Sequence, residues 1–191
     1  QLELFDVLAS SRALPLHYSG YCTVFWTYFA IDANDSVALS RCVDRLSEIL
    51  AALESDPDLY QCLKPNHENR AELLMSVHLA RLRALMALQA TKALNNAAIE
   101  LFASTCRYDP FAIDCATAVR VMTTIMRSLT IAAVMAWHAE DASRFDAVVM
   151  EMERLRQAFL AKRFDQLSNE TKAFQRHFAD AVLALLLECQ W

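Results

Sequence analysis

Four polar side chains recur along one face of the otherwise apolar segment 110–138. They are Arg120, Thr124, Arg127 and His138. Two guanidinium groups on one face suit an anion such as a carboxylate or a phosphate, because arginine presents a planar fork of hydrogen-bond donors. A solvated helix edge, or an ion pair with a neighbouring acid, is the more common reason for such a pattern. The sequence therefore offers this stripe as an anion-binding candidate beside a purely structural interpretation.

A second candidate surface is the segment 18–29, in which half of the residues are aromatic. These are Tyr18, Tyr21, Phe25, Trp26, Tyr28 and Phe29. At 100° per residue they fall within about 160° of one helical face, and small residues occupy the other. The common interpretation is an aromatic core helix whose small face packs closely on a neighbour. The alternative is a hydrophobic pocket or partner-binding groove, because tyrosine and tryptophan tips suit a wet rim.

The patterns that usually mark catalytic or metal centres are missing from the sequence. It has no Glu-x-x-His, no His-x-x-x-His, no Cys-x-x-Cys and no Gly-x-Ser-x-Gly. The acid pairs Asp32/Asp35 and Asp56/Asp58 stand at predicted corners, where helix capping explains them. We therefore expect no catalytic residue, no metal and no cofactor, and we favour a non-catalytic function. A helical enzyme with scattered catalytic residues is retained as a third alternative.

The elements that position these side chains are predicted from a shortage of glycine. The chain of 191 residues has a single glycine, Gly20, where average usage is ~7%. Without glycine a chain can hardly form a hairpin-rich sheet or a phosphate-binding loop. We predict an all-α fold with no β-sheet, either a helical bundle or stacked helical hairpins around the 110–138 helix.

Corners marked by proline, asparagine and aspartate divide the chain into about eight or nine helices. Asp35 and Asp141 are expected to be N-caps, and Asn95-Asn96 is expected to break one helix from the next. The predicted helices lie near 2–10, 17–31, 36–54, 57–63, 67–93, 96–107, 110–138, 142–164 and 168–190.

The helix at 142–164 has the clearest periodicity. Its apolar seam is Phe145, Val148, Met152, Leu155 and Phe159. Glu151, Glu153, Arg154 and Arg156 are expected on the opposite, wet face.

Charge and cysteine content limit the partners and the compartment. The net charge is −5 and no Lys/Arg cluster stands free of acids, so we expect no nucleic-acid partner. The uncharged window 13–31 contains Pro15, Gly20 and several hydroxyls, so we expect no membrane span. Six cysteines favour free thiols in an intracellular compartment, with Cys106 and Cys115 able to meet across a corner. Two glycosylation sequons and the even cysteine count leave secretion as the alternative.

The sequence thus predicts a single all-helical domain, residues 1–191, within a larger protein. The leading function is a non-catalytic protein–protein interaction or scaffold domain with a protein partner or self-association, since 55% of the residues are hydrophobic. The alternative is a ligand-sensing regulatory domain that binds a small hydrophobic molecule at residues 18–29. The identity of the partner or ligand, the oligomeric state and the disulfide state are not determined by the sequence.

Overall fold

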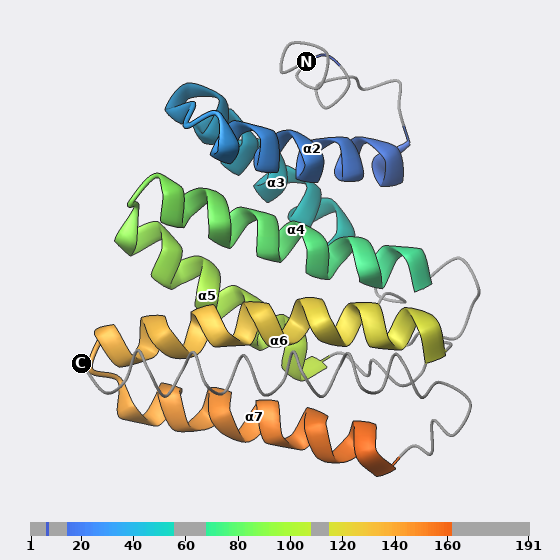
Figure 1. The fold of residues 1–191 in the computed structure, drawn as a ribbon, viewed down its shortest axis with the longest axis vertical. Helices are drawn as coiled ribbons and strands as arrows, with labels where there is room; N and C mark the ends of the chain where they lie inside the picture. The colour runs from blue at the N-terminus through green and yellow to red at the C-terminus, as the bar shows by residue number, and fades with distance from the viewer. Residues whose placement is uncertain (1–6, 8–14, 56–67, 108–114, 162–191) are drawn as a thin grey trace. The chain divides into compact units, whose positions relative to one another are not determined.

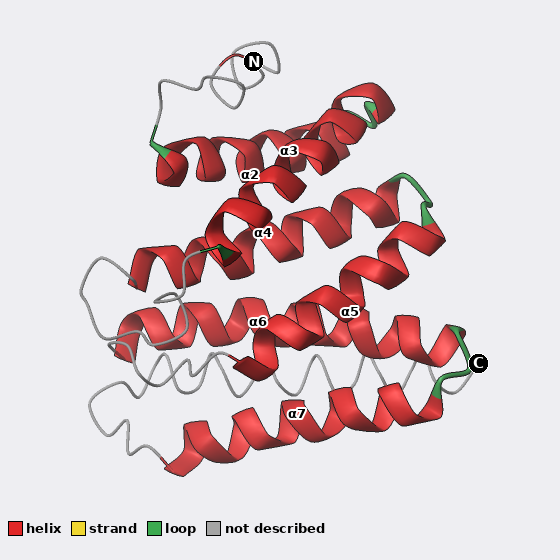
Figure 2. Ribbon diagram, turned by 180° about the vertical axis from the view of Figure 1, so that it is seen from behind, coloured by secondary structure: helices red, strands yellow, loops and turns green. Residues whose placement is uncertain are grey.

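A computed structural model of the chain describes residues 15–55, 68–107 and 115–161, together with Val7. Every regular element in these ranges is an α-helix, and no strand occurs among them (Figures 1 and 2), so the all-α prediction is confirmed. The internal contacts gather into two compact units, residues 1–97 and residues 98–191. Within each unit the helices pack as in a bundle. The prediction of one single domain is not tested by this grouping and stays a prediction.

The described ranges hold six helices, not the eight or nine that we predicted. They are α2 (Leu16–Asp32), α3 (Ser36–Glu54), α4 (Glu68–Ala87), α5 (Thr91–Arg107), α6 (Cys115–His138) and α7 (Ala142–Ala161). The helices expected near 2–10, 57–63 and 168–190 lie outside the described residues, as does the Asp56/Asp58 pair.

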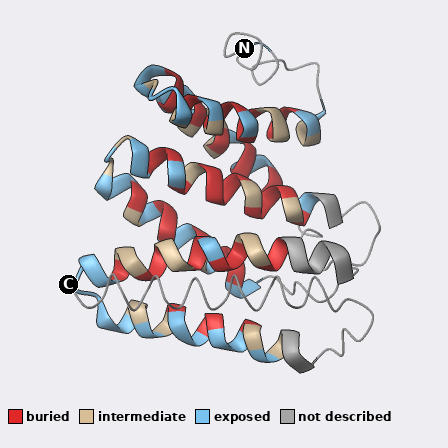
Figure 3. Cartoon of the chain, viewed as in Figure 1, coloured by how far each residue is buried: buried red, intermediate tan, exposed pale blue. Residues whose placement is uncertain are grey.

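Helix α4 is the central helix of the first unit, where α2, α3 and α4 pack pairwise against one another. Figure 3 shows α4 buried along most of its middle. Between residues 71 and 85 the exceptions are Glu72, Ser76, Arg81 and Arg83. The sequence pattern predicts a helix covered on all sides at 110–138 instead. It does not indicate α4, because these polar residues lower the mean hydropathy of a helix that is otherwise apolar all round.

Helix α2 approaches α4 through its small-residue face. A Cβ on Gly20 would lie 2.9 Å from both Cδ atoms of Leu73, which is fully buried on α4. Ser19, Thr23 and Thr27, on the same side of α2, are also buried. The Thr23 and Thr27 hydroxyls each donate to the carbonyl four residues earlier at 2.8 Å. Since these hydroxyls are satisfied within the helix, the polar face can be buried without losing hydrogen bonds.

In the second unit α6 and α7 run side by side (Figures 1 and 2). The predicted α7 seam is confirmed at Val148, Met152 and Leu155, which are all buried. Glu151 was expected on the wet face, but it is buried beside the same seam and is only 8% exposed. Arg154 compensates its charge by donating two hydrogen bonds, 2.7 and 2.6 Å, to the two carboxylate oxygens.

Three described corners use the same backbone solution without glycine. Asn34, Gln89 and Glu140 adopt left-handed φ values of 52°, 53° and 54°. Each donates its amide to the carbonyl three residues earlier, and the next residue donates to the carbonyl five residues earlier, at 2.9–3.0 Å. This is the Schellman helix ending, in which glycine is the usual left-handed residue. A side chain there costs roughly 1–2 kcal/mol.

Two of these corners continue directly into an aspartate N-cap, as predicted. Asp35 accepts from the amides of Val37 and Ala38 at 3.1 and 2.9 Å, and Asp141 accepts from the Arg144 amide at 3.0 Å. The predicted break at Asn95-Asn96 is wrong, because both residues lie inside α5. The break comes at Gln89, whose left-handed conformation carries no sequence signal.

The helices of the described ranges include none that combines the length and the apolar character needed to cross a membrane.

The close approach of α2 to α4 predicts the effect of Gly20→Ala. Overpacking against Leu73 should cost ~1–3 kcal/mol, while alanine recovers ~1 kcal/mol of helix propensity. We expect the free energy of unfolding, measured by urea denaturation, to fall by about 1 kcal/mol. In a Leu73→Ala background the new methyl has space, so Gly20→Ala should then stabilise the protein. Equal destabilisation in both backgrounds would contradict the contact.

The left-handed corners predict opposite effects for two Gln→Gly substitutions. Gln89→Gly should raise the free energy of unfolding by about 1 kcal/mol, because glycine adopts positive φ without steric cost. Gln157→Gly, at an exposed position within α7, should lower it by about 1 kcal/mol. Asn34→Gly should gain less than Gln89→Gly, since asparagine tolerates this conformation. Thermal denaturation of the three variants checks the signs, and a loss of stability in Gln89→Gly would refute the account.

Candidate functional site

The structure exposes the aromatic face of α2 and buries the opposite one. Tyr18, Phe25 and Phe29 retain 61%, 55% and 41% of their surface in contact with solvent. Tyr21 and Cys22, which lie on the same side, are half-buried. At ~100° per residue, Tyr18, Cys22, Phe25 and Phe29 fall within about 60° of one another. We call these four residues, with Tyr21 at their edge, the aromatic face.

Trp26 and Tyr28, also predicted for this site, lie at the two borders of the aromatic face. Trp26 is 3% exposed and packs in a cluster of small residues that includes Ala30, Ala38 and Ala84. Tyr28 is half-buried, and the Arg83 guanidinium of α4 lies 5.4 Å from the centre of its ring. The structure therefore separates the six predicted aromatic residues. Four lie on the open side of α2, and two pack toward α3 and α4.

The N-terminal end of the aromatic face has an ordered polar border. The His17 ring makes edge contacts with the rings of Tyr18 and Tyr21, at centroid distances of 5.4 and 5.0 Å. Arg45 of α3 donates a 3.0 Å hydrogen bond to the Ser19 hydroxyl on the buried side. An apolar strip with a polar border is the usual composition of a protein-binding surface.

The open position of these rings bears on the two alternatives from the sequence. A pocket for a small hydrophobic molecule encloses most of the ligand, so its lining side chains are themselves largely covered. Tyr18 and Phe25 are each more than half exposed, and Trp26 is buried among other side chains. The geometry therefore favours an open contact surface over an enclosed cavity.

The predicted anion site on α6 is only partly brought together. Arg127 and His138 are exposed and Thr124 is half-buried, while the side chain of Arg120 lies outside the described residues. The Thr124 carbonyl accepts the Ser128 hydroxyl at 2.9 Å, which is an ordinary contact within a helix. His138 is eleven residues beyond Arg127, or roughly 16 Å along the helix axis. His138 and Arg127 are therefore too far apart to hold the same small anion.

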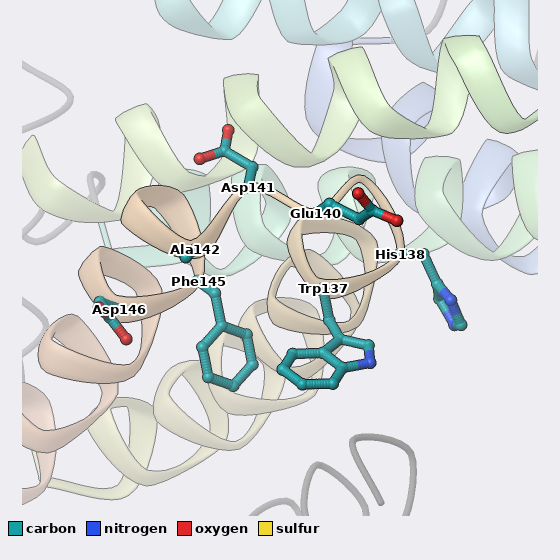
Figure 4. A pocket seen from close by; sticks show the side chains of 7 residues that line it. All are labelled: Trp137, His138, Glu140, Asp141, Ala142, Phe145 and Asp146. Atoms are coloured by element: carbon teal, nitrogen blue, oxygen red, sulfur yellow. The ribbon is translucent and has the colours of Figure 1, made fainter. Parts of the chain in front are cut away.

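His138 instead lines a pocket of about 600 Å³ where α6 turns into α7. We call it the corner pocket, and the described residues that line it are Trp137, His138, Glu140, Asp141, Ala142, Phe145 and Asp146. The Trp137 and Phe145 rings lie side by side (Figure 4), with their centres 5.7 Å apart. Sequence reasoning missed this pocket because its two rings belong to different helices. An available signal was the pair of aromatic residues flanking the predicted Asp141 cap.

Among the described residues, the shifted pKa values have local causes. Burial raises the pKa of the Cys106 thiol, and the charge of Glu151 raises it further, while Arg154 acts in the opposite direction. On α7 the pKa of Glu153 is lowered to about 2, chiefly because Arg156 donates hydrogen bonds of 2.7 and 2.6 Å to its carboxylate. The Glu153 carboxylate in turn raises the pKa of Arg156. None of these groups lines the corner pocket.

Cysteines and metal ligands do not form a centre within the described ranges. Cys22, Cys42 and Cys106 form no disulfide there. No group of three or more His, Cys, Asp or Glu side chains in the same ranges is arranged to hold a metal ion.

Substitutions at two neighbouring residues on α2 should change the free energy of unfolding by very different amounts. Trp26→Ala removes a large buried side chain and should lower the free energy of unfolding by about 3–5 kcal/mol. Phe25→Gln replaces a side chain that is 55% exposed and should change it by less than about 0.5 kcal/mol. Urea denaturation followed by circular dichroism measures both. A loss of more than about 2 kcal/mol in Phe25→Gln would show that the aromatic face belongs to the core.

No protein-family model, no curated protein and no solved structure matches this chain. Comparison with known proteins therefore assigns no function to the aromatic face or to the corner pocket. Both surfaces are interpreted from their own chemistry.

Proposed function

We propose that this chain is a non-catalytic helical interaction domain that binds a protein partner along the aromatic face of α2. One observation carries the proposal. Tyr18, Phe25 and Phe29 stand exposed in a row, while the opposite face of the same helix is packed against its neighbours. Large exposed aromatic side chains that form a continuous strip are typical of contact surfaces.

The size of the aromatic face sets the strength of such a contact. A buried aromatic side chain covers ~150–250 Å², so the exposed parts of the three rings amount to on the order of 300 Å². At ~25 cal/mol per Å² this area is worth roughly 7 kcal/mol before the losses of association. These losses are at least ~4 kcal/mol. The aromatic face alone therefore supports a weak, reversible complex, and a tight complex needs further contacts around it.

The spacing of the aromatic face fits an amphipathic partner helix. Tyr18, Cys22, Phe25 and Phe29 follow one another at intervals of four, three and four residues. This is the seam spacing by which two helices pack side by side, and the seam extends roughly 16 Å. An amphipathic helix laid on an apolar groove is a common mode of recognition. The partner is therefore expected to present apolar side chains at the same spacing.

Site-specific photocrosslinking tests the proposal. With p-benzoylphenylalanine in place of Phe25, we expect a discrete crosslinked product in extract of the cells of origin. The same label in place of Met150, which is 73% exposed on α7, should give no such product. Adding Phe29→Glu should reduce the Phe25 product about tenfold or more, because a buried charge at an interface core weakens binding strongly.

Three outcomes of this experiment are informative. A product of twice the chain mass of 21.6 kDa would identify a second copy of the chain as the partner. Equal products from Phe25 and Met150, or a Phe25 product unaffected by Phe29→Glu, would contradict the proposal.

A further inference from the structure

The corner pocket combines two aromatic rings with three carboxylates. Of the seven described residues that line it, Glu140, Asp141 and Asp146 are acidic, and none is lysine or arginine. In Figure 4 Asp146 lies beside Phe145, and Glu140 lies at the end of α6 with its carboxylate directed toward the side of His138, while the Asp141 carboxylate points away from the rings. Asp141 caps α7 through the Arg144 amide. The charges available to a ligand are therefore those of Asp146, beside the rings, and Glu140, at the end of α6.

We propose that the pocket between α6 and α7 binds a basic side chain, arginine or lysine, presented by a peptide segment of a partner. An aromatic ring attracts a cation placed over its face through its quadrupole, and tryptophan is the best of these rings. Trp137 is 44% exposed, so its ring is accessible to such a cation. Carboxylates beside the ring add direct attraction for the same charge.

The openness of the pocket favours a side chain over a free small molecule. A small-molecule site encloses ~70–90% of its ligand. Apart from the half-buried Phe145, all the described lining residues here are exposed. A side chain carried by a larger partner does not need this enclosure, because contacts made elsewhere by the partner add to its binding.

Glutamate at position 140 stands where the corner needs a left-handed residue, with φ of 54°. The same position in the α4–α5 corner is occupied by Gln89, with φ of 53°. Glutamine therefore fits this backbone, and Glu140→Gln removes the charge without changing the corner. The test variant combines Glu140→Gln with Asp146→Asn. Asp146 is exposed on the surface of α7.

Nuclear magnetic resonance of the ¹⁵N-labelled chain provides the test. The chain has three tryptophans, and the indole signal of Trp137 is identified by its loss in Trp137→Leu. Acetyl-Ala-Arg-Ala-amide should shift this signal with a Kd on the order of 1 mM, the range expected for one cation–π contact with exposed ion pairs. The peptide with citrulline in place of arginine has the same shape without the charge, and it should leave the signal unmoved.

The variants separate the two contributions. The double variant Glu140→Gln/Asp146→Asn should raise the Kd for the arginine peptide about fivefold. Trp137→Leu, followed through backbone amide signals of residues 138–146, should raise it about threefold. Asp44→Asn removes an exposed acid of α3, outside the pocket, and should leave the Kd unaltered.

The proposal is overturned if the citrulline peptide shifts the Trp137 signal as strongly as the arginine peptide. It is also overturned if the double variant and Asp44→Asn have the same Kd. Tighter binding of tetramethylammonium chloride than of the arginine peptide would assign the pocket to a free small cation instead, and would likewise reject it.

Discussion

The close contact of α2 with α4 at Gly20 and Leu73 is the constraint on which the first unit depends. A residue without a side chain allows this approach without displacing Leu73, since an added Cβ would lie 2.9 Å from the leucine methyls. The contact fixes the rotation of α2 about its axis. Once the small face is turned inward, the residues on the other side of the helix must face outward. The exposure of Tyr18 and Phe25 is therefore a consequence of how α2 packs, and it does not arise from loose packing.

The corners show how the chain folds with one glycine. Three non-glycine residues take the left-handed conformation at described corners, and two of these are followed at once by an aspartate that caps the next helix. Each corner gives up some stability to steric strain, and the aspartate caps recover part of it, at ~1 kcal/mol each. The connections are short, so the helices on either side are held in a fixed register. This rigidity places Trp137 and Phe145, from two helices, next to each other at one corner.

Local chemistry explains which features were predictable from the sequence. The all-α class, the caps at Asp35 and Asp141 and the seam of α7 follow from residues close in sequence, and all three were predicted. The corner at Gln89 was missed because glutamine carries no turn signal. The two faces of α2 were identified from periodicity, but which of them faces the core depends on Leu73 in a distant helix. Burial of Glu151 likewise depends on its pairing with Arg154, which periodicity alone does not reveal.

The two candidate surfaces differ in the forces that they offer a partner. The aromatic face of α2 offers apolar area, whose contribution is almost independent of salt. The corner pocket offers carboxylates beside two rings, and its attraction for a cation weakens as ionic strength rises. A partner that used the aromatic face alone would bind in the same way at low and high salt. A partner whose affinity fell with salt would have to use the pocket or another charged surface, so salt dependence distinguishes which surface carries a given interaction.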